Sequence, residues 1–418
     1  AKLNRGRRIL EDSLSDGKRI YGVSTSVGYS SGRLVGPEHS QEFAYQIIRQ
    51  HGCGVGAPFS RQEGRAIVFA RLVSLAKGYS AVRPALLEAL CRLLNHDLIP
   101  VIPSLGSVGA SGDLTPLSYL AAVLCGEREA YYEGEVLPAA EALERAGLPV
   151  HDFVPKESLA IMNGTAVMTA IGAITVTRFD RTLAACEQAC ALAAEVLYGR
   201  SQAFHPTAHA LKHHPGQIAS AAAIRAALDG SRLIDSHKEA GRIIQDPYSI
   251  RCSPHVIGAA RDASSWMRQV LQRELNSVND NPIVDPDRGD TILAGNFYGG
   301  HIALAMDLLK TAASSVADLV DRQYALLVDS IDYSLWLMLL LAASATGLAL
   351  SGDLFNIYVF YELMAVASFG LVAFAQSLFP LWAHHPATAG LRVHLANGLY
   401  LNALLDRLIG GFRTTKTN

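Results

Sequence analysis

The stretch GSVGASGDLTPL, residues 106–117, places Ala110, Ser111 and Gly112 in a glycine-rich bend that follows an apolar, proline-containing run. Because glycine has no Cβ, the Gly112 nitrogen can approach the Ala110 carbonyl carbon and adopt the dihedral angles that a ring needs. Loss of one water closes a five-membered ring, and loss of the Ser111 hydroxyl as a second water leaves an exocyclic methylene. The product, a methylidene-imidazolone, is an electrophile, which no ordinary side chain is. The stretch therefore predicts an enzyme that acts on an amine.

Taken alone, Ala-Ser-Gly is a common turn tripeptide, so the residues around it decide between the two interpretations. Residues 95–117 resemble the signature of the histidine and phenylalanine ammonia-lyase family, and further blocks of that family follow in order over residues 21–330. The resemblance implies a mostly α-helical fold with a long-helix bundle. It also implies a methylidene-imidazolone formed from residues 110–112, with no imported cofactor.

Tyr21 heads the block YGVSTSVG, residues 21–28, and matches the family's loop tyrosine. The resemblance implies that its phenolate removes the β-proton of the substrate. A phenol is mostly protonated at neutral pH, so such a site must stabilise the anion. Residues 25–28 read Thr-Ser-Val-Gly where the family commonly has Thr-Gly-Phe-Gly, a departure that touches the shape of the loop. A loop tyrosine that only packs on the surface is the alternative.

Two later blocks carry residues that the resemblance assigns to substrate binding. Asn163 lies in KESLAIMNGTAVM and would hydrogen-bond near the methylidene ring, although an Asn before Gly is also typical of a turn. Gln245, Tyr248 and Arg251 lie in QDPYSIRCSPHVIG. Arg251 would clamp the substrate carboxylate, because its planar guanidinium suits bidentate binding. Tyr248 and Gln245 would line the sites of the ring and the carboxylate.

The block AGNFYGG contributes Asn296 and Phe297, of which Phe297 would pack beside the electrophilic ring unless it is an ordinary core residue. In RQHGCGVG, residues 49–56, His51 occupies the place of a residue that contacts the substrate ring in the family. An imidazole or a phenol could hydrogen-bond to His51, whereas phenylalanine would leave it without a partner. We therefore expect deamination of histidine to urocanate or of tyrosine to coumarate. Ammonia-lyase and aminomutase share all these parts and stay open as alternatives.

The composition favours a protein with a large core and a small-molecule substrate. Half of the 418 residues are hydrophobic, and the net charge is −2 with no basic patch, so no nucleic-acid partner is expected. The six cysteines form no CxxC pair, and although Cys186 and Cys190 share a helical spacing, no His/Cys pair accompanies them. We expect no metal and reduced thiols in a cytoplasmic protein.

Three regions differ in character along the chain. Residues 1–150 mix loops with helical stretches and hold the tripeptide. Residues 151–330 predict long helices at about 158–199, 254–276 and 301–327, which suggest an incomplete lyase bundle. Family members share active sites between the subunits of a homotetramer, so the resemblance implies a homo-oligomer here. The resemblance to the lyase family ends near residue 330. We therefore expect a truncated enzyme whose activity is impaired.

Residues 331–418 change abruptly in composition. Residues 333–350 and 363–383 carry no charge, and about 20 apolar residues span a bilayer. These stretches predict two transmembrane-like helices and membrane association over 333–383, with a pair of buried core helices as the alternative. Residues 351–374 resemble proton-translocating antiporter subunits related to respiratory complex I. That resemblance implies a proton-carrying role for Glu362, for which a position at a helix end is the alternative. We expect a fusion near Ser330, and a membrane-embedded antiporter fragment with an inactive lyase portion is the alternative function.

Overall fold

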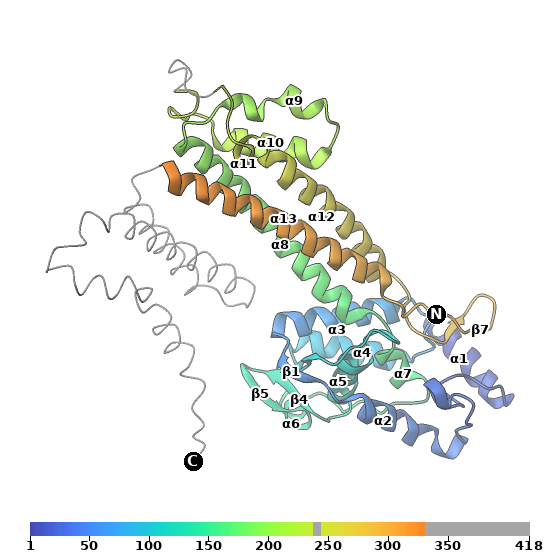
Figure 1. Cartoon of the computed structure of the whole chain (residues 1–418). Coiled ribbons are helices and arrows are strands. Elements are labelled where there is room, and N and C mark those ends of the chain that lie inside the picture. The colour runs from blue at the N-terminus through green and yellow to red at the C-terminus, as the bar shows by residue number, and fades with distance from the viewer. Residues whose placement is uncertain (237–243, 331–418) are drawn as a thin grey trace, which may run out of the picture. The chain divides into compact units, whose positions relative to one another are not determined.

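The computed structural model describes residues 1–236 and 244–330. Within these residues it contains thirteen α-helices and seven short strands, so the expectation of a mostly α-helical protein is confirmed. The helices are α1 (Lys2–Ser15), α2 (Ser40–His51), α3 (Arg61–Ala76), α4 (Pro84–Asn95), α5 (Leu114–Leu124), α6 (Ala139–Arg145), α7 (Glu157–Met162), α8 (Ala166–Val196), α9 (Pro206–Ala210), α10 (Pro215–Ala227), α11 (Tyr248–Arg251), α12 (Ser253–Leu275) and α13 (Gly300–Ser330). Figure 1 shows the order of these elements along the chain.

The described residues fall into two compact units, and each is described by itself. The first unit comprises Ala1–Cys186, His209–Ser220 and His255–Val316. The second contains residues 187–208, 221–236, 244–254 and 317–330.

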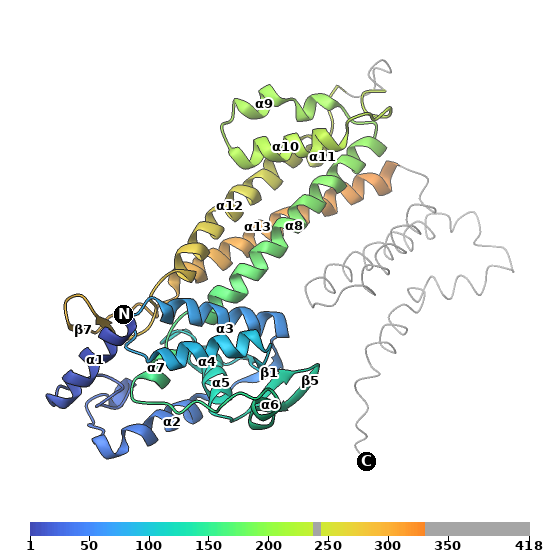
Figure 2. The same ribbon diagram turned by 180° about the vertical axis from the view of Figure 1, so that it is seen from behind.

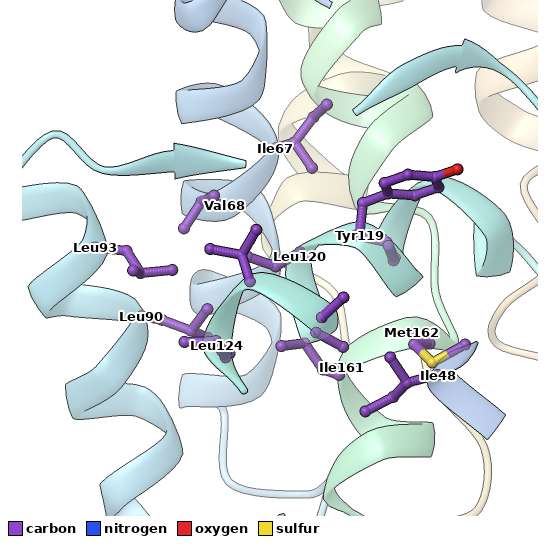
Figure 3. Packing of buried hydrophobic residues seen from close by; sticks show 14 of the residues in the cluster. Ile48, Ile67, Val68, Leu90, Leu93, Tyr119, Leu120, Leu124, Ile161 and Met162 are labelled. Atoms are coloured by element: carbon purple, nitrogen blue, oxygen red, sulfur yellow. The ribbon is translucent and has the colours of Figure 1, made fainter. Parts of the chain in front are cut away.

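The main core of the first unit is formed by α2, α3, α4, α5 and α7. Figure 3 shows the side chains that meet there: Ile48 of α2, Ile67 and Val68 of α3, Leu90 and Leu93 of α4, Tyr119, Leu120 and Leu124 of α5, and Ile161 and Met162 of α7. Burying a side chain of this size stabilises the fold by roughly 1.5–3 kcal/mol. Residues 115–124 of α5 and all of α7 are buried, so these two helices are central.

Two central helices adjoin two segments that the sequence analysis singles out. The loop with Ala110, Ser111 and Gly112 runs directly into α5, and Asn163 directly follows α7. The contact between α5 and α7 therefore brings together two segments that lie about fifty residues apart in the sequence.

Short antiparallel strands connect these helices. β1 (Val55–Pro58) pairs with β3 (Pro103–Leu105), with Val55 opposite Leu105. β4 (Glu129–Tyr132) lies between β2 (Ile99–Pro100) and β5 (Glu135–Pro138), and β6 (Ile283–Asp285) forms a hairpin with β7 (Asp290–Ile292). The first pair places the segment after α2 beside the residues that lead into the tripeptide loop.

The long helices are close to the expected ones, with one correction. Helices predicted at 254–276 and 301–327 correspond to α12 and α13. The single helix predicted from about 158 to 199 is wrong, because it breaks at Asn163, which is extended, and Gly164, whose φ is +158°. Two helices, α7 and α8, result, and the break is where the chain meets the tripeptide loop.

Within the first unit, α8, α12 and α13 pack side by side, as the two opposite views agree (Figure 1 and Figure 2). A Cβ added at Gly172 of α8 would lie 3.0 Å from Leu271 of α12 and 3.4 Å from Met306 of α13. Arg268 Nε of α12 also donates to Asp180 of α8 at 2.7 Å. Close packing of three long helices is the bundle geometry that the sequence predicted.

The expectations for residues 331–418, including the two apolar helices over 333–383, the fusion near residue 330 and the role of Glu362, lie outside the described residues. They stay predictions. None of the helices in residues 1–236 and 244–330 combines the length and apolar character that a membrane span requires.

Candidate active site

Gly112 lies in a backbone position that only glycine fits. Its φ is +73°, a left-handed conformation that costs other residues about 1 kcal/mol or more. A Cβ there would also overlap the carbonyl oxygen of Gly164, which accepts a hydrogen bond from Asp113 N at 2.7 Å. The tripeptide is therefore held against the break between α7 and α8 by backbone-to-backbone contact.

Asn163 holds the same tripeptide through its side chain. Its Nδ2 donates to the Ser111 carbonyl oxygen at 2.8 Å, and the residue is only 4% exposed. Its Oδ1 is buried and has no protein partner. A buried acceptor without a donor is costly, so this oxygen is poised to receive one from a group bound at the tripeptide.

Asp113 is a residue of this site that the sequence reasoning missed. Its Oδ2 accepts hydrogen bonds from Val167 N and Met168 N, both at 3.0 Å, at the start of α8. Its Oδ1 accepts one from Ser107 Oγ at 3.1 Å. Burial raises the pKa of this carboxyl to about 6, although the three hydrogen bonds act to lower it. Asp113 thus ties both ends of the loop to the N-terminus of α8. An Asp between a glycine-rich bend and an apolar helix was the available signal.

Buried charged and polar side chains pack against Gly164, where a Cβ would overlap Arg71 and Asn279. The guanidinium of Arg71 donates to Asn279 Oδ1 and to the Ala160 carbonyl, each at 2.6 Å. Burial lowers the pKa of Arg71 to about 10, which leaves it charged at neutral pH. Lys156 pairs with Asp280 at 2.7 Å, and both side chains are fully buried. Sequence patterns did not single these residues out, because buried and exposed charges look alike in a single sequence.

The loop of Tyr21 is packed against α7. A Cβ on Gly22, whose φ is +66°, would overlap the side chain of Leu159. Gly28 N donates to Tyr21 Oη at 2.9 Å. The loop therefore lies next to the helix that leads to Asn163.

His51 ends α2 and is half-buried. Its Nδ1 lies 2.8 Å from the carbonyl oxygen of Ile47. A carbonyl can only accept, so Nδ1 carries the proton, and in the neutral ring Nε2 is an acceptor. Gly54 follows, and a Cβ on it would lie 3.3 Å from the Leu105 carbonyl oxygen. This segment thus adjoins the start of the tripeptide loop.

Asn296 and Phe297 belong to a segment that approaches the start of α8. A Cβ on Gly299 would overlap Met168, whose backbone nitrogen donates to Asp113. Phe297 is half-buried, whereas the exposed Asn296 donates through Nδ2 to the Val278 carbonyl at 3.0 Å. Within the first unit, Asn163 thus contacts the tripeptide directly, and the segment of His51 adjoins the residues that lead into the loop. The segments of Tyr21 and Phe297 adjoin α7 and the start of α8.

Gln245, Tyr248 and Arg251 belong to the second unit and are described apart from the loop. Gln245 is exposed, and Tyr248 is 72% exposed. The Arg251 guanidinium lies 4.3 Å from the Tyr248 ring centroid, and its Nε donates to the Asp246 carbonyl at 3.0 Å. Gln323 of α13 donates to the Ser249 carbonyl at 2.8 Å and so fixes this turn.

A model of the aromatic amino acid lyase family matches residues 1–350. The chain belongs to the aromatic amino acid lyase family. The family match begins before and ends after the residues 21–330 that the motifs covered.

Relatives in this family include both lyases and aminomutases. The chain is 42% identical over 332 residues to the histidine ammonia-lyase of Gloeobacter violaceus, and the aligned region covers 79% of this chain and 64% of that protein. It is 40% identical over 323 residues to the histidine ammonia-lyase of Caldanaerobacter subterraneus, covering 77% and 63%. The solved structure of tyrosine aminomutase from Streptomyces globisporus aligns with a TM-score of 0.74 and 31% identity, over 89% of this chain and 80% of that one. The chain thus spans a little under two thirds of the length of these curated ammonia-lyases.

The residues around the tripeptide fit a methylidene-imidazolone formed there. A Cβ on Gly112 would overlap the Gly164 backbone, and Asn163 offers an unpartnered acceptor beside its bond to Ser111. Among residues 1–236 and 244–330 no three His, Cys, Asp or Glu side chains gather in a way that could hold a metal ion.

Proposed function

We propose that this family member deaminates an aromatic amino acid without oxidation, through a methylidene-imidazolone formed from Ala110, Ser111 and Gly112 and without an imported cofactor. The observation that carries the proposal is the contact of Gly112 with Gly164, together with the hydrogen bond from Asn163 to Ser111. These contacts hold the tripeptide in a bend, which favours attack of the Gly112 nitrogen on the Ala110 carbonyl carbon.

The ring forms in two dehydrations. The new bond joins Gly112 N to the Ala110 carbonyl carbon, and that carbonyl oxygen leaves as water with the hydrogens of Gly112 N and Ser111 N. A C=N double bond between the Ala110 carbon and Ser111 N takes the place of the lost C=O bond. The Ser111 hydroxyl then leaves with a proton from its own Cα, as a second water. Once formed, the group supplies an electrophilic methylene that accepts the substrate's amine, a poor leaving group by itself.

The side chains of this chain perform the remaining tasks. Tyr21 takes the β-proton on its phenolate oxygen, which the Gly28 N–H stabilises. Asn163 accepts a hydrogen bond on its unpartnered Oδ1. Arg251 clamps the substrate carboxylate with its guanidinium, and Gln245 and Tyr248 line the carboxylate and ring sites. Asn296 stays among the substrate-binding residues, and Phe297 packs beside the ring.

His51 selects the substrate by its tautomer. Because Nδ1 donates to the Ile47 carbonyl, the neutral ring presents Nε2 as an acceptor. A substrate ring with an N–H or O–H donor satisfies it, whereas phenylalanine leaves it unpaired, which costs about 1–3 kcal/mol. We therefore propose histidine or tyrosine as the substrate, with urocanate or coumarate and ammonia as products.

An aminomutase is the second candidate, because a solved tyrosine aminomutase is 37% identical over 77% of this chain. The two activities differ in whether the amine is released or returned to the β-carbon. In either case we propose a homo-oligomer, with a tetramer as the family's form, in the cytoplasm.

Incubation of the purified protein with histidine or tyrosine tests the proposal. We expect urocanate or coumarate with an equal amount of ammonia, and no product from Ser111→Ala, which cannot form the methylene. A β-amino acid in place of ammonia would assign the aminomutase. Equal product from wild type and Ser111→Ala would contradict the proposal.

A further inference from the structure

Arg128 follows α5 in the sequence, and its side chain contacts the segment after α2, residues 51–54. Neither the proposed mechanism nor the sequence patterns give Arg128 a role. It lies between α5 and β4 in a left-handed conformation with φ of +67°. Ala139 N donates to its carbonyl at 2.7 Å. A non-glycine residue held in this conformation carries strain, and such residues cluster at functional positions.

The guanidinium of Arg128 binds the first carbonyl after His51. α2 ends at His51, so the Gly52 carbonyl has no partner within the helix. Arg128 Nη2 donates to this oxygen at 2.8 Å and places a positive charge at the helix C-terminus, where it is favourable. A Cβ on Gly52 would overlap Nη2 and lie 3.0 Å from Cζ. The guanidinium therefore occupies the space that any side chain at position 52 would need.

Tyr119 of α5 also contacts residues 51–54. Its ring centroid lies 5.0 Å from the Arg128 guanidinium carbon, within the range of a cation–π contact. Its hydroxyl donates to the Gly54 carbonyl at 3.3 Å. The segment after His51 is thus tied at two carbonyls, by two side chains that also contact each other.

We propose that Arg128 is a specificity-positioning residue that holds residues 51–54 so that His51 presents Nε2 to the substrate ring. The inference rests on the proposed function, in which His51 reads a ring donor. The hydrogen bond from Nδ1 to Ile47 sets the tautomer of His51, and Arg128 fixes where the end of α2 lies. Because a hydrogen bond weakens steeply with distance and angle, a displacement of His51 by about 1 Å would weaken the contact of its Nε2 with the substrate ring.

Three variants separate this role from a general effect on folding. Arg128→Ala removes the donor, and Gly52→Ala displaces the guanidinium from the other side, with a backbone φ of −76° that alanine accepts. Arg49→Ala is the matched control. Arg49 lies in the same last turn of α2 and forms its ion pair with Glu127, the residue before Arg128, without touching Gly52 oxygen. Arg49→Ala therefore removes one positive charge near the C-terminus of α2, as Arg128→Ala does, but leaves the hydrogen bond to the Gly52 carbonyl in place.

Kinetics with histidine, tyrosine and phenylalanine form the first measurement. We expect Arg128→Ala and Gly52→Ala each to raise KM for the preferred ring-donor substrate about tenfold, with kcat changed less than about threefold. We also expect a smaller preference over phenylalanine, normal methylidene-ring absorption, and no added effect in the double variant. Arg49→Ala should leave the preference unchanged. Wild-type preference in Arg128→Ala, or an equal loss in Arg49→Ala, would overturn the inference.

Amide hydrogen exchange of the peptide covering residues 49–57 is the second measurement, and it needs no turnover. Arg128→Ala should speed exchange there and leave the peptide of residues 107–124 unchanged, and Arg49→Ala should do so less. If the wild-type protein deaminates none of the three amino acids, the proposed function fails. Amide hydrogen exchange of residues 49–57 then tests by itself whether Arg128 positions this segment. Unchanged exchange in Arg128→Ala would then reject it.

Discussion

Two glycines of the same loop have similar backbones but different surroundings, which makes them a test of the site at the scale of single residues. Gly109 and Gly112 have φ values of +69° and +73°. A Cβ on Gly109 meets nothing within 4 Å, whereas one on Gly112 overlaps the Gly164 carbonyl. Gly112→Ala should therefore prevent ring formation, while Gly109→Ala should cost only about 1 kcal/mol of stability and keep the ring. Absorption spectra of the two proteins check this, and a ring in Gly112→Ala would contradict it.

Tyr21 offers a second test at this scale, with a neighbour as its control. Tyr21→Phe removes the proposed base and should lower kcat about a hundredfold or more, with the methylidene ring still formed. Tyr29→Phe changes a fully exposed tyrosine of the same loop and should leave kcat unchanged. Steady-state rates with the preferred substrate decide. Wild-type turnover in Tyr21→Phe would remove Tyr21 from the mechanism.

At the scale of elements, the start of α7 depends on one buried carboxylate. Glu157 is fully buried and bonds to Arg83, the residue before α4, and to His151. Burial by itself would raise the pKa of Glu157, but hydrogen bonds from His151 and Arg83 outweigh it and lower the pKa from 4.5 to about 2. A lowered pKa means that Glu157 stabilises the fold above about pH 4.5 and loses this contribution as the pH falls toward 2.

Glu157→Gln should accordingly lower the free energy of unfolding by about 3 kcal/mol at pH 7, and the difference from wild type should shrink below pH 4.5. Glu141→Gln, which breaks an exposed ion pair with Arg145, should cost less than about 1 kcal/mol. Urea unfolding at several pH values measures both. A difference for Glu157→Gln that stays constant down to pH 2 would contradict the assigned cause.

Sequence periodicity predicted the long helices well but not the break that builds the site. α12 and α13 follow their predicted ranges, because a sustained apolar stripe needs only local spacing. The helix expected over 158–199 breaks because Asn163 and Gly164 bond to residues about fifty positions away, at Ser111 and Asp113. Such a tertiary contact overrides helix propensity and is invisible to periodicity.

At the scale of the whole molecule, the roles that the family motifs gave to Tyr21 and His51 stay predictions. The same motifs singled out Asn163, whose side chain bonds to the loop. The motifs did not predict the buried residues Arg71 and Asp113, which bond to the segments around the loop. Arg71 and Asp113 act through burial, and burial follows from packing among segments far apart in the sequence. The roles of Gln245, Tyr248 and Arg251 stay predictions, since they belong to the second unit.

The apolar stretches at 333–350 and 363–383 lead to a prediction about the full chain. If they form membrane helices, the full chain should sediment with membranes and need detergent for release, whereas a chain ending at Ser330 should not. Alkaline carbonate extraction followed by immunoblotting checks this, with the shorter chain as the control. Full chain in the carbonate-soluble fraction would contradict the prediction.

The central claim is that residues 110–112 become an amine-binding electrophile, and the mass of one peptide tests it most directly. We predict that the proteolytic peptide containing Ala110, Ser111 and Gly112 is lighter than its sequence mass by two water molecules in folded wild-type protein. The same peptide from Gly112→Ala should have its full mass. A wild-type peptide at its full sequence mass, from protein shown to be folded, would contradict the account.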